Sequence, residues 1–338
     1  MKIIEEILIF FLVVLFTFSI GCDATKDDSI YSNDIEYNHE EVLIINNEEE
    51  LQTILTTKAP ADFSGNLVFM PEVKEIRGEW RNAKSITIKE GVESIGMDAF
   101  RWSKADIYLP SSITEINSTF IGATGCFSVS EDNPRYYCIN SMLIDADTST
   151  LIHINHDQTS VIIPIEVKYI GAEACSHNNR INRVMMPHSV KTIGMMAFSD
   201  CPNLVSVQLS KDLEELTIDV FTDSPIKQLV IPPHVQFIYD ESNNMFGGNN
   251  GPRSLVIEGN EIAIRKKDFY GENTSLQYIV FTSTPPKEYD EGTFRLYAES
   301  FVIYYINDYR QAWEPNGENL WDGITIIGID TLNDLPSV

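Results

Sequence analysis

A 23-residue period across residues 161–209 is the feature that most restricts how this chain can fold. Pro164 recurs as Pro187, and Gly171 recurs as Gly194, each 23 residues later and without a gap. A fixed period of this length is the signature of a solenoid, in which small units stack along one axis. A single unit is too small to bury its own apolar face, so each unit needs a neighbour on both sides.

Each unit is expected to contain two short strands. In the unit that begins at Arg183, apolar and polar residues alternate as they do in strands, and the apolar positions are Val184, Met186, Val190 and Ile193. Pro187 ends the first run because proline has no N–H to continue a strand ladder. Gly194 ends the second run because glycine allows a sharp turn.

The unit resembles the BspA-type leucine-rich repeat, whose pattern runs L-x-x-V-x-I-P-x-S-V-x-x-I-G-x-x-A-F-x-x-C. Residues 184–201 follow it closely, reading Val-Met-Met-Pro-His-Ser-Val-Lys-Thr-Ile-Gly-Met-Met-Ala-Phe-Ser-Asp-Cys. The resemblance extends from about Val68 to Ile327. It implies an α/β, β-rich fold class, namely a right-handed leucine-rich-repeat solenoid with units of about 23 residues and non-repeat caps.

The period and its interruptions also predict how the chain is divided. The segment before residue 85 lacks the repeat pattern, as expected for a cap over the first coil. Alternating apolar runs and turn residues between the second and third clear units predict extra β-hairpins. The predicted segments are a signal peptide at 1–21, a flexible acidic tether at 22–41, an N-terminal cap at 42–84, a solenoid at 85–281 with an insert at 122–160, and a C-terminal cap at 282–338.

The first residues predict export and lipidation. Residues 7–20 form an apolar run of 14 residues, which is short for a membrane span and typical of a signal-peptide core. Gly21-Cys22 resembles a bacterial lipobox, which makes Cys22 the predicted lipidation site, and Lys26-Asp27-Asp28 resembles the export signal of surface lipoproteins. The expected location is therefore the outer membrane, with a lipid anchor and exposure on the cell surface. An ordinary secretion signal or an uncleaved anchor is the alternative.

The charge balance excludes one class of partner. The chain has 24 basic and 50 acidic residues, and its formal net charge is −26. Binding to nucleic acid requires clustered lysine and arginine, so we expect no nucleic-acid partner. The acidic surface favours solubility, and it would also suit cations or a basic partner.

Neither the histidines nor the cysteines form a recognisable catalytic or metal-binding motif. His153 and His156 are the one close histidine pair, and we expect surface or edge positions for them because further ligands at helical spacing are missing. Cys126 and Cys138 lie in the insert, where they either pair or remain free thiols. We therefore predict no enzyme, no metal site and no cofactor.

Strand alternation predicts a row of outward side chains two positions before each repeat proline. We call this set the central row, and its members are Thr87, Tyr108, Ile162, Met185, Gln208, Val230, Val256 and Val280. Most of them are apolar or aromatic, and exposed apolar surface often marks a partner site. The predicted ligand-binding residues are Tyr108, Ile162, Met185, Val230 and Val256. The alternatives are that β-propensity alone selects these residues, or that the insert or a cap packs over them.

The resemblance implies a function that the residues themselves do not specify. BspA-type repeats imply a surface-anchored lipoprotein that binds protein or glycan ligands, including host extracellular matrix, in adhesion. The alternative is a structural or accessory subunit of an outer-membrane assembly. Membrane contact in either case is expected through the lipid anchor at Cys22.

Overall fold

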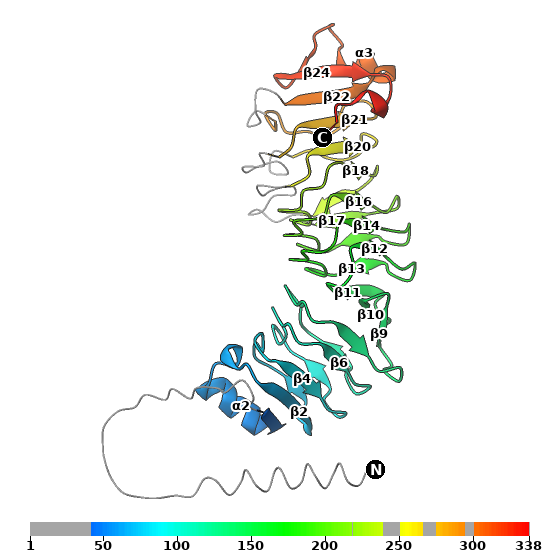
Figure 1. Ribbon diagram of the computed structural model, residues 1–338. Coiled ribbons are helices and arrows are strands. Elements are labelled where there is room, and N and C mark those ends of the chain that lie inside the picture. The colour runs from blue at the N-terminus through cyan, green and yellow to red at the C-terminus, as the bar shows by residue number, and fades with distance from the viewer. Residues whose placement is uncertain (1–41, 218, 239–250, 266–274, 295–300, 338) are drawn as a thin grey trace, which may run out of the picture. The chain divides into compact units, whose positions relative to one another are not determined.

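The computed structural model describes residues 42–217, 219–238, 251–265, 275–294 and 301–337. Within these ranges the chain forms a β-solenoid (Figure 1), so the predicted repeat fold is confirmed. Its α-helices there are α2 (Glu48–Thr57) and the single turn α3 (Arg310–Trp313), which makes the fold strongly β-rich. The short 3-10 helices are η1 (Pro60–Asp62), η3 (Asn307–Tyr309) and η4 (Leu332–Asp334).

We call the two strand-bearing sides of the solenoid face A and face B. Face A contains β2 (Asn66–Glu72), β4 (Ser85–Ile88), β6 (Ile107–Leu109), β8 (Phe127–Val129), β12 (Ser160–Ile162), β14 (Arg183–Met185), β16 (Ser206–Gln208), β18 (Leu229–Ile231), β20 (Ser254–Ile257), β21 (Tyr278–Phe281), β22 (Val302–Ile306) and β24 (Ile324–Ile329). Its sheets are ordered β1-β2-β4, β6-β8, β12-β14-β16 and β18-β20-β21-β22-β24-β23, where β1 is Val42–Asn47 and β23 is Leu320–Trp321.

Face B contains β3 (Glu75–Ile76), β5 (Ser94–Ile95), β7 (Glu115–Ile116), β9 (Tyr136–Ile139), β10 (Met142–Asp145), β11 (Thr150–Ile154), β13 (Tyr169–Ile170), β15 (Thr192–Ile193), β17 (Glu215–Thr217) and β19 (Gln236–Ile238). Its sheets are ordered β3-β5-β7 and β19-β17-β15-β13-β11-β10-β9. The strands from β13 to β19 are all parallel.

The 23-residue period sets the register between successive coils. On face A, Val161 pairs with Val184 and Val184 with Val207, so residues one period apart lie side by side. On face B, Ile170 pairs with Ile193 in the same way. All five side chains point into the interior and are buried. Equal spacing thus aligns like residues into continuous apolar ladders.

The N-terminal segment covers the first coil with a strand and a helix. β1 pairs in parallel with β2, and α2 follows β1 directly. Asn47 caps the helix, because its side-chain oxygen accepts a hydrogen bond from the Glu50 N–H at 3.0 Å. Leu51 and Ile54 are buried on the inner side of the helix. A strand and a helix that lack the repeat pattern thus lie over the first coil.

The insert adds antiparallel strands to face B. β9, β10 and β11 form an antiparallel meander, and β11 then pairs in parallel with β13 of the regular repeats. The predicted hairpins are therefore confirmed. The apolar interior divides into two main clusters at this point, one extending from Ile45 to Leu143 and the other from Met142 to Ile326.

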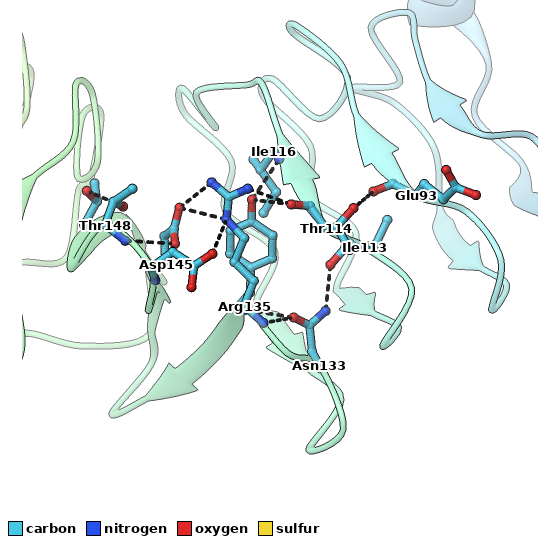
Figure 2. A network of polar contacts seen from close by, with 11 residues as sticks. Glu93, Ile113, Thr114, Ile116, Asn133, Arg135, Asp145 and Thr148 are labelled. Atoms are coloured by element: carbon cyan, nitrogen blue, oxygen red, sulfur yellow. Dashed lines mark hydrogen bonds and ion pairs between the residues drawn. The ribbon is translucent and has the colours of Figure 1, made fainter.

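Side chains replace a strand ladder where β7 meets the insert (Figure 2). The Arg135 guanidinium donates from Nη1 to the Thr114 carbonyl oxygen at 2.8 Å and from Nη2 to Asp145 Oδ2 at 2.8 Å. Asp145 Oδ1 accepts a further bond from the Thr148 N–H. Burial alone would raise the pKa of Asp145, but the bonds from Arg135 and the backbone outweigh burial and lower it. The carboxylate is therefore held in its charged form.

On the face A side of the insert, the side chain of Asn155 also takes the place of a neighbouring strand. Its side-chain oxygen accepts from the Phe127 N–H at 2.9 Å, and its Nδ2 donates to the Phe127 carbonyl oxygen at 3.1 Å. One buried amide thus pairs with both backbone groups of a residue in β8, as a neighbouring strand would.

Aromatic rings fill the interior of the last coils. Trp313 lies 5.1 Å from Phe281 and 5.2 Å from Trp321 between ring centroids. The Trp313 indole N–H donates to the Ser283 carbonyl oxygen at 2.8 Å. These rings pack beneath β21 and β22, which continue the parallel sheet of the repeats.

We expect Asn155→Ala to lower the free energy of unfolding by about 3 kcal/mol, because it leaves the two backbone groups of Phe127 without this buried partner. Urea denaturation of the purified chain measures the loss. Asn82→Ala is the matched control, since it removes a similar bond, from Asn82 Nδ2 to the Ala61 carbonyl oxygen, at an exposed position. The control should cost less than about 1 kcal/mol, and equal losses in both variants would contradict the role given to Asn155.

Candidate binding face

Strand pairing on face A aligns the central row in separate runs, because its strands belong to different sheets, and Thr87 of β4 is not paired with Tyr108 of β6. Tyr108 pairs with Ser128, which lies in line with the row. A second run continues through Ile162, Met185 and Gln208. A third run contains Val230, Val256, Val280, Tyr304 and Ile327, the last two of which extend the row beyond the predicted set.

The first two runs and the start of the third present apolar side chains at the surface. The exposed fraction is 64% for Ile162, 53% for Tyr108 and 38% for Val230, and Met185 is half-buried. Neighbouring strands are about 4.8 Å apart, so successive members of each run are close enough to form one contact strip. The outward orientation predicted for these four residues is therefore confirmed, and their role in binding remains a prediction.

A polar row borders this strip on the same face. Its exposed members are Ser85, Asp106, Ser160, Arg183 and Ser206. It offers hydroxyl groups with one acidic and one basic side chain, and Asp106 also accepts a hydrogen bond from the Cys126 N–H at 2.8 Å. An apolar strip with a polar border is the composition of a protein-binding surface.

The prediction that Val256 belongs to the exposed part of the row is wrong. Val256 and Val280 are both 0% exposed. They form a separate outer cluster with Tyr278 and Ile329, against which Tyr304, Ile306 and Leu335 pack. The strands β20 and β21 are thus covered on both sides, and Val256 is not available to an outside ligand while this cover is in place.

The prediction of surface positions for His153 and His156 is also wrong. Their exposed fractions are 1% and 6%. The two rings stack on each other with centroids 5.9 Å apart, and His153 also meets Phe127 edge-on at 5.1 Å. None of the four ring nitrogens has a hydrogen-bond partner. The alternation of Leu151 with His153 along β11 was the available signal, because it places both on the inner side.

Burial keeps this histidine pair neutral. It lowers the pKa of His153 to about 3, with a smaller contribution from His156. It lowers the pKa of His156 to about 4, with a smaller contribution from His177. His177 in turn lies against Trp102, with ring centroids 4.6 Å apart. The insert therefore contains a buried site that opposes protonation. By contrast, His188 and His234 are exposed.

The four described cysteines are free thiols. Cys126 and Cys138 are half-buried and are not joined, and burial raises the pKa of Cys138 to about 11. Cys175 and Cys201 are fully buried, as expected for small core residues, and the Cys201 thiol donates to the Cys175 carbonyl oxygen at 3.1 Å. Among the residues that the structure describes, no group of three or more potential ligands is arranged to hold a metal ion.

The predicted signal peptide and Cys22 lie outside the described residues. Within the described ranges, no helix has the length and apolar character needed to cross a membrane.

The repeat pattern is matched by one family of proteins. A family model for the BspA type leucine-rich repeat region matches six copies, over residues 79–131 and 153–275. The chain belongs to this family. The gap between the two matched ranges contains β9 and β10, so this part of the insert departs from the family pattern. No curated protein sequence matches the chain.

Two solved structures share the fold at low sequence identity. The pneumococcal vaccine antigen PcpA is 20% identical with a TM-score of 0.65, and the match covers 80% of this chain and 69% of that one. A leucine-rich cell surface protein of Faecalibacterium prausnitzii A2-165 is 22% identical with a TM-score of 0.55, covering 68% of this chain and 62% of that one. Both likenesses support the solenoid fold.

We expect acid to destabilise the chain through the histidine pair. In the unfolded state a histidine has a pKa near 6.5, and in the folded state burial holds the pKa values of this pair at about 3 and about 4. The unfolded chain therefore takes up protons first, so the stabilisation present above pH 6.5 is lost as the pH falls toward 4. His153→Phe should reduce the fall in unfolding free energy between pH 8 and pH 5 by about 2 kcal/mol.

Urea denaturation at several pH values measures this effect. His188→Phe is the control, because His188 is exposed and packs against no such cluster. The wild-type chain and the control should lose the same free energy on acidification, while His153→Phe loses less. If the unfolding free energies of all three proteins fall equally with pH, the acid sensitivity does not come from His153.

Proposed function

We propose that this chain is a surface-anchored lipoprotein that binds protein or glycan ligands through face A. The observation that carries the proposal is the outward apolar side chains of Tyr108, Ile162, Met185 and Val230, which lie on three sheets of face A and have a polar border. Side chains that take part only in strand packing do not need to expose large apolar surface, whereas a partner site does. Repeat solenoids commonly bind partners along a sheet of this kind.

The chemistry of the strip favours a protein ligand over a glycan. Aliphatic side chains such as Ile162 and Met185 gain free energy by removing apolar surface from water, which a protein partner supplies more readily than a sugar. The border hydroxyl groups and Arg183 can then satisfy polar groups at the edge of the contact. The chain thus combines an apolar centre for affinity with a polar rim for alignment.

The proposed location is the bacterial cell surface, with a lipid anchor at Cys22 in the outer membrane. It is supported by the lipobox-like Gly21-Cys22 and by the acidic segment that follows. The Faecalibacterium structure is described as a cell surface protein and PcpA as a vaccine antigen, and both descriptions agree with an exposed position. A ligand reached from this position would include host extracellular matrix.

We expect Ile162→Asp with Met185→Asp to weaken ligand binding at least tenfold, because both charges fall in the centre of the strip. The measurement is surface binding of the purified chain to a panel of immobilised extracellular-matrix proteins and glycans. Tyr169→Asp is the matched control, since Tyr169 is exposed on β13 of the same coil but on face B. Binding that survives the double substitution, or that Tyr169→Asp removes equally, would place the ligand elsewhere.

A second experiment tests the anchor. External protease applied to intact cells should remove the wild-type protein, and Cys22→Ala should leave the protein unattached to the membrane, because the lipid is joined to that sulfur. If the protein stays protected from protease, it lies on the periplasmic side of the outer membrane. Membrane attachment unaffected by Cys22→Ala would rule out lipidation at this residue.

A further inference from the structure

The C-terminal segment 331–337 lies over one end of the central row. Leu335 packs against the outer cluster of Val256, Tyr278, Val280 and Ile329. The Tyr278 hydroxyl donates to the Pro336 carbonyl oxygen at 3.2 Å. The exposed fraction along the row falls from 38% at Val230 to 0% at the next residue, Val256. Tyr304 and Ile306 of β22 pack against the same cluster, so this segment covers the row together with these two side chains.

The segment has the form of a bound peptide ligand. Thr331 and Asp334 form a capping box around η4, which ends the preceding chain in one compact turn. Leu335 then adopts an extended backbone with φ −73° and ψ 148°, and Pro336 follows it. Proline favours this extended form before any contact is made, so holding the segment in place costs little conformational entropy.

Few contacts hold this segment against the sheet. Leu335 is half-buried, while Pro336, Ser337 and the residues of η4 are exposed. One apolar side chain and one hydrogen bond to the backbone therefore account for the contact described here. A contact of this size can open while the sheet beneath stays folded.

The covered and open parts of the row are one continuous surface. Val230 pairs directly with Val256, and Val256 pairs with Val280. The three side chains are all valine and lie at the same position of successive coils. A segment that fits over Val256 and Val280 meets the same apolar chemistry and strand spacing at Val230. Met185 and Ile162 offer similar apolar side chains on the neighbouring sheet, beyond the exposed Gln208 of β16.

We propose that the central row binds an extended leucine-proline segment of a protein ligand, and that residues 331–337 are an internal copy of that ligand. The inference rests on the proposed function and narrows its ligand class to an extended peptide. It also gives the C-terminal segment a regulatory role, because its release would uncover Val256 and Val280 and lengthen the binding strip.

The test uses a fluorescent peptide with the sequence Thr-Leu-Asn-Asp-Leu-Pro-Ser-Val and the full-length chain. Fluorescence anisotropy should detect weak, saturable binding to the wild-type chain through the open part of the row. Leu335→Asp should release the internal segment and bind the peptide at least tenfold more tightly. A control peptide, in which the second leucine is replaced by aspartate, should bind neither protein.

Hydrogen exchange of β20 and β21 reports whether Leu335→Asp has released the segment. If Leu335→Asp has not released the segment, a shortened chain that ends at Asp330 is used in place of this variant. The shortened chain keeps β24 complete. Absence of binding to the released protein, or equal binding of the control peptide, would overturn the inference. Equal affinity for the wild-type and released proteins would also overturn it, because the peptide would then bind away from the covered strands.

Failure of this inference and failure of the proposed function give different results. If the ligand is not an extended peptide, the released protein does not bind the peptide, while Ile162→Asp with Met185→Asp still abolishes capture of the matrix ligand. If the matrix ligand does not bind at Ile162 and Met185, the released protein still binds the peptide over β20 and β21, while capture of the matrix ligand is unaffected by the double substitution.

Discussion

Backbone pairing between successive coils is the interaction on which the rest of this structure depends. A strand of three residues, such as β14, has no stability of its own and persists because β12 and β16 pair with it on either side. The same pairing positions every side chain along the solenoid, since a residue on one strand has its counterpart on the next. The apolar ladders inside and the central row outside are two results of one register.

Where backbone pairing between coils is interrupted, polar side chains bond to the backbone groups that are left unpaired. At the insert, the guanidinium of Arg135, the carboxylate of Asp145 and the amide of Asn155 bond to backbone groups that a regular coil would satisfy with its own backbone. Each of these side chains has the fixed planar geometry that a peptide group has. Polar residues in the interior of the insert are thus part of the ladder, and the same region contains the buried pair of His153 and His156.

The sequence predicts local features well because they depend on spacing alone. The register of Val161 with Val184, the hairpins of the insert and the exposure of Ile162 all follow from the period or from strand alternation. Val256 could not be placed correctly in this way, because it occupies the same repeat position as Val230 and differs only in what covers it. The residues that cover it, Tyr304, Ile306 and Leu335, lie far along the chain, and no local pattern records these contacts. His153 was misplaced because histidine is usually exposed, although its alternation with Leu151 pointed inward.

The division of the interior at the insert has a consequence for cooperativity. In a linear stack, the free energy of each coil is coupled only to its nearest neighbours, so unfolding spreads from coil to coil and stops where coupling is weakest. Here the two apolar clusters meet at Met142 and Leu143, next to the ion pair of Arg135 and Asp145. We therefore expect the coupling between coils to be weakest at the insert, so that unfolding started by a pulling force or a protease stops there first.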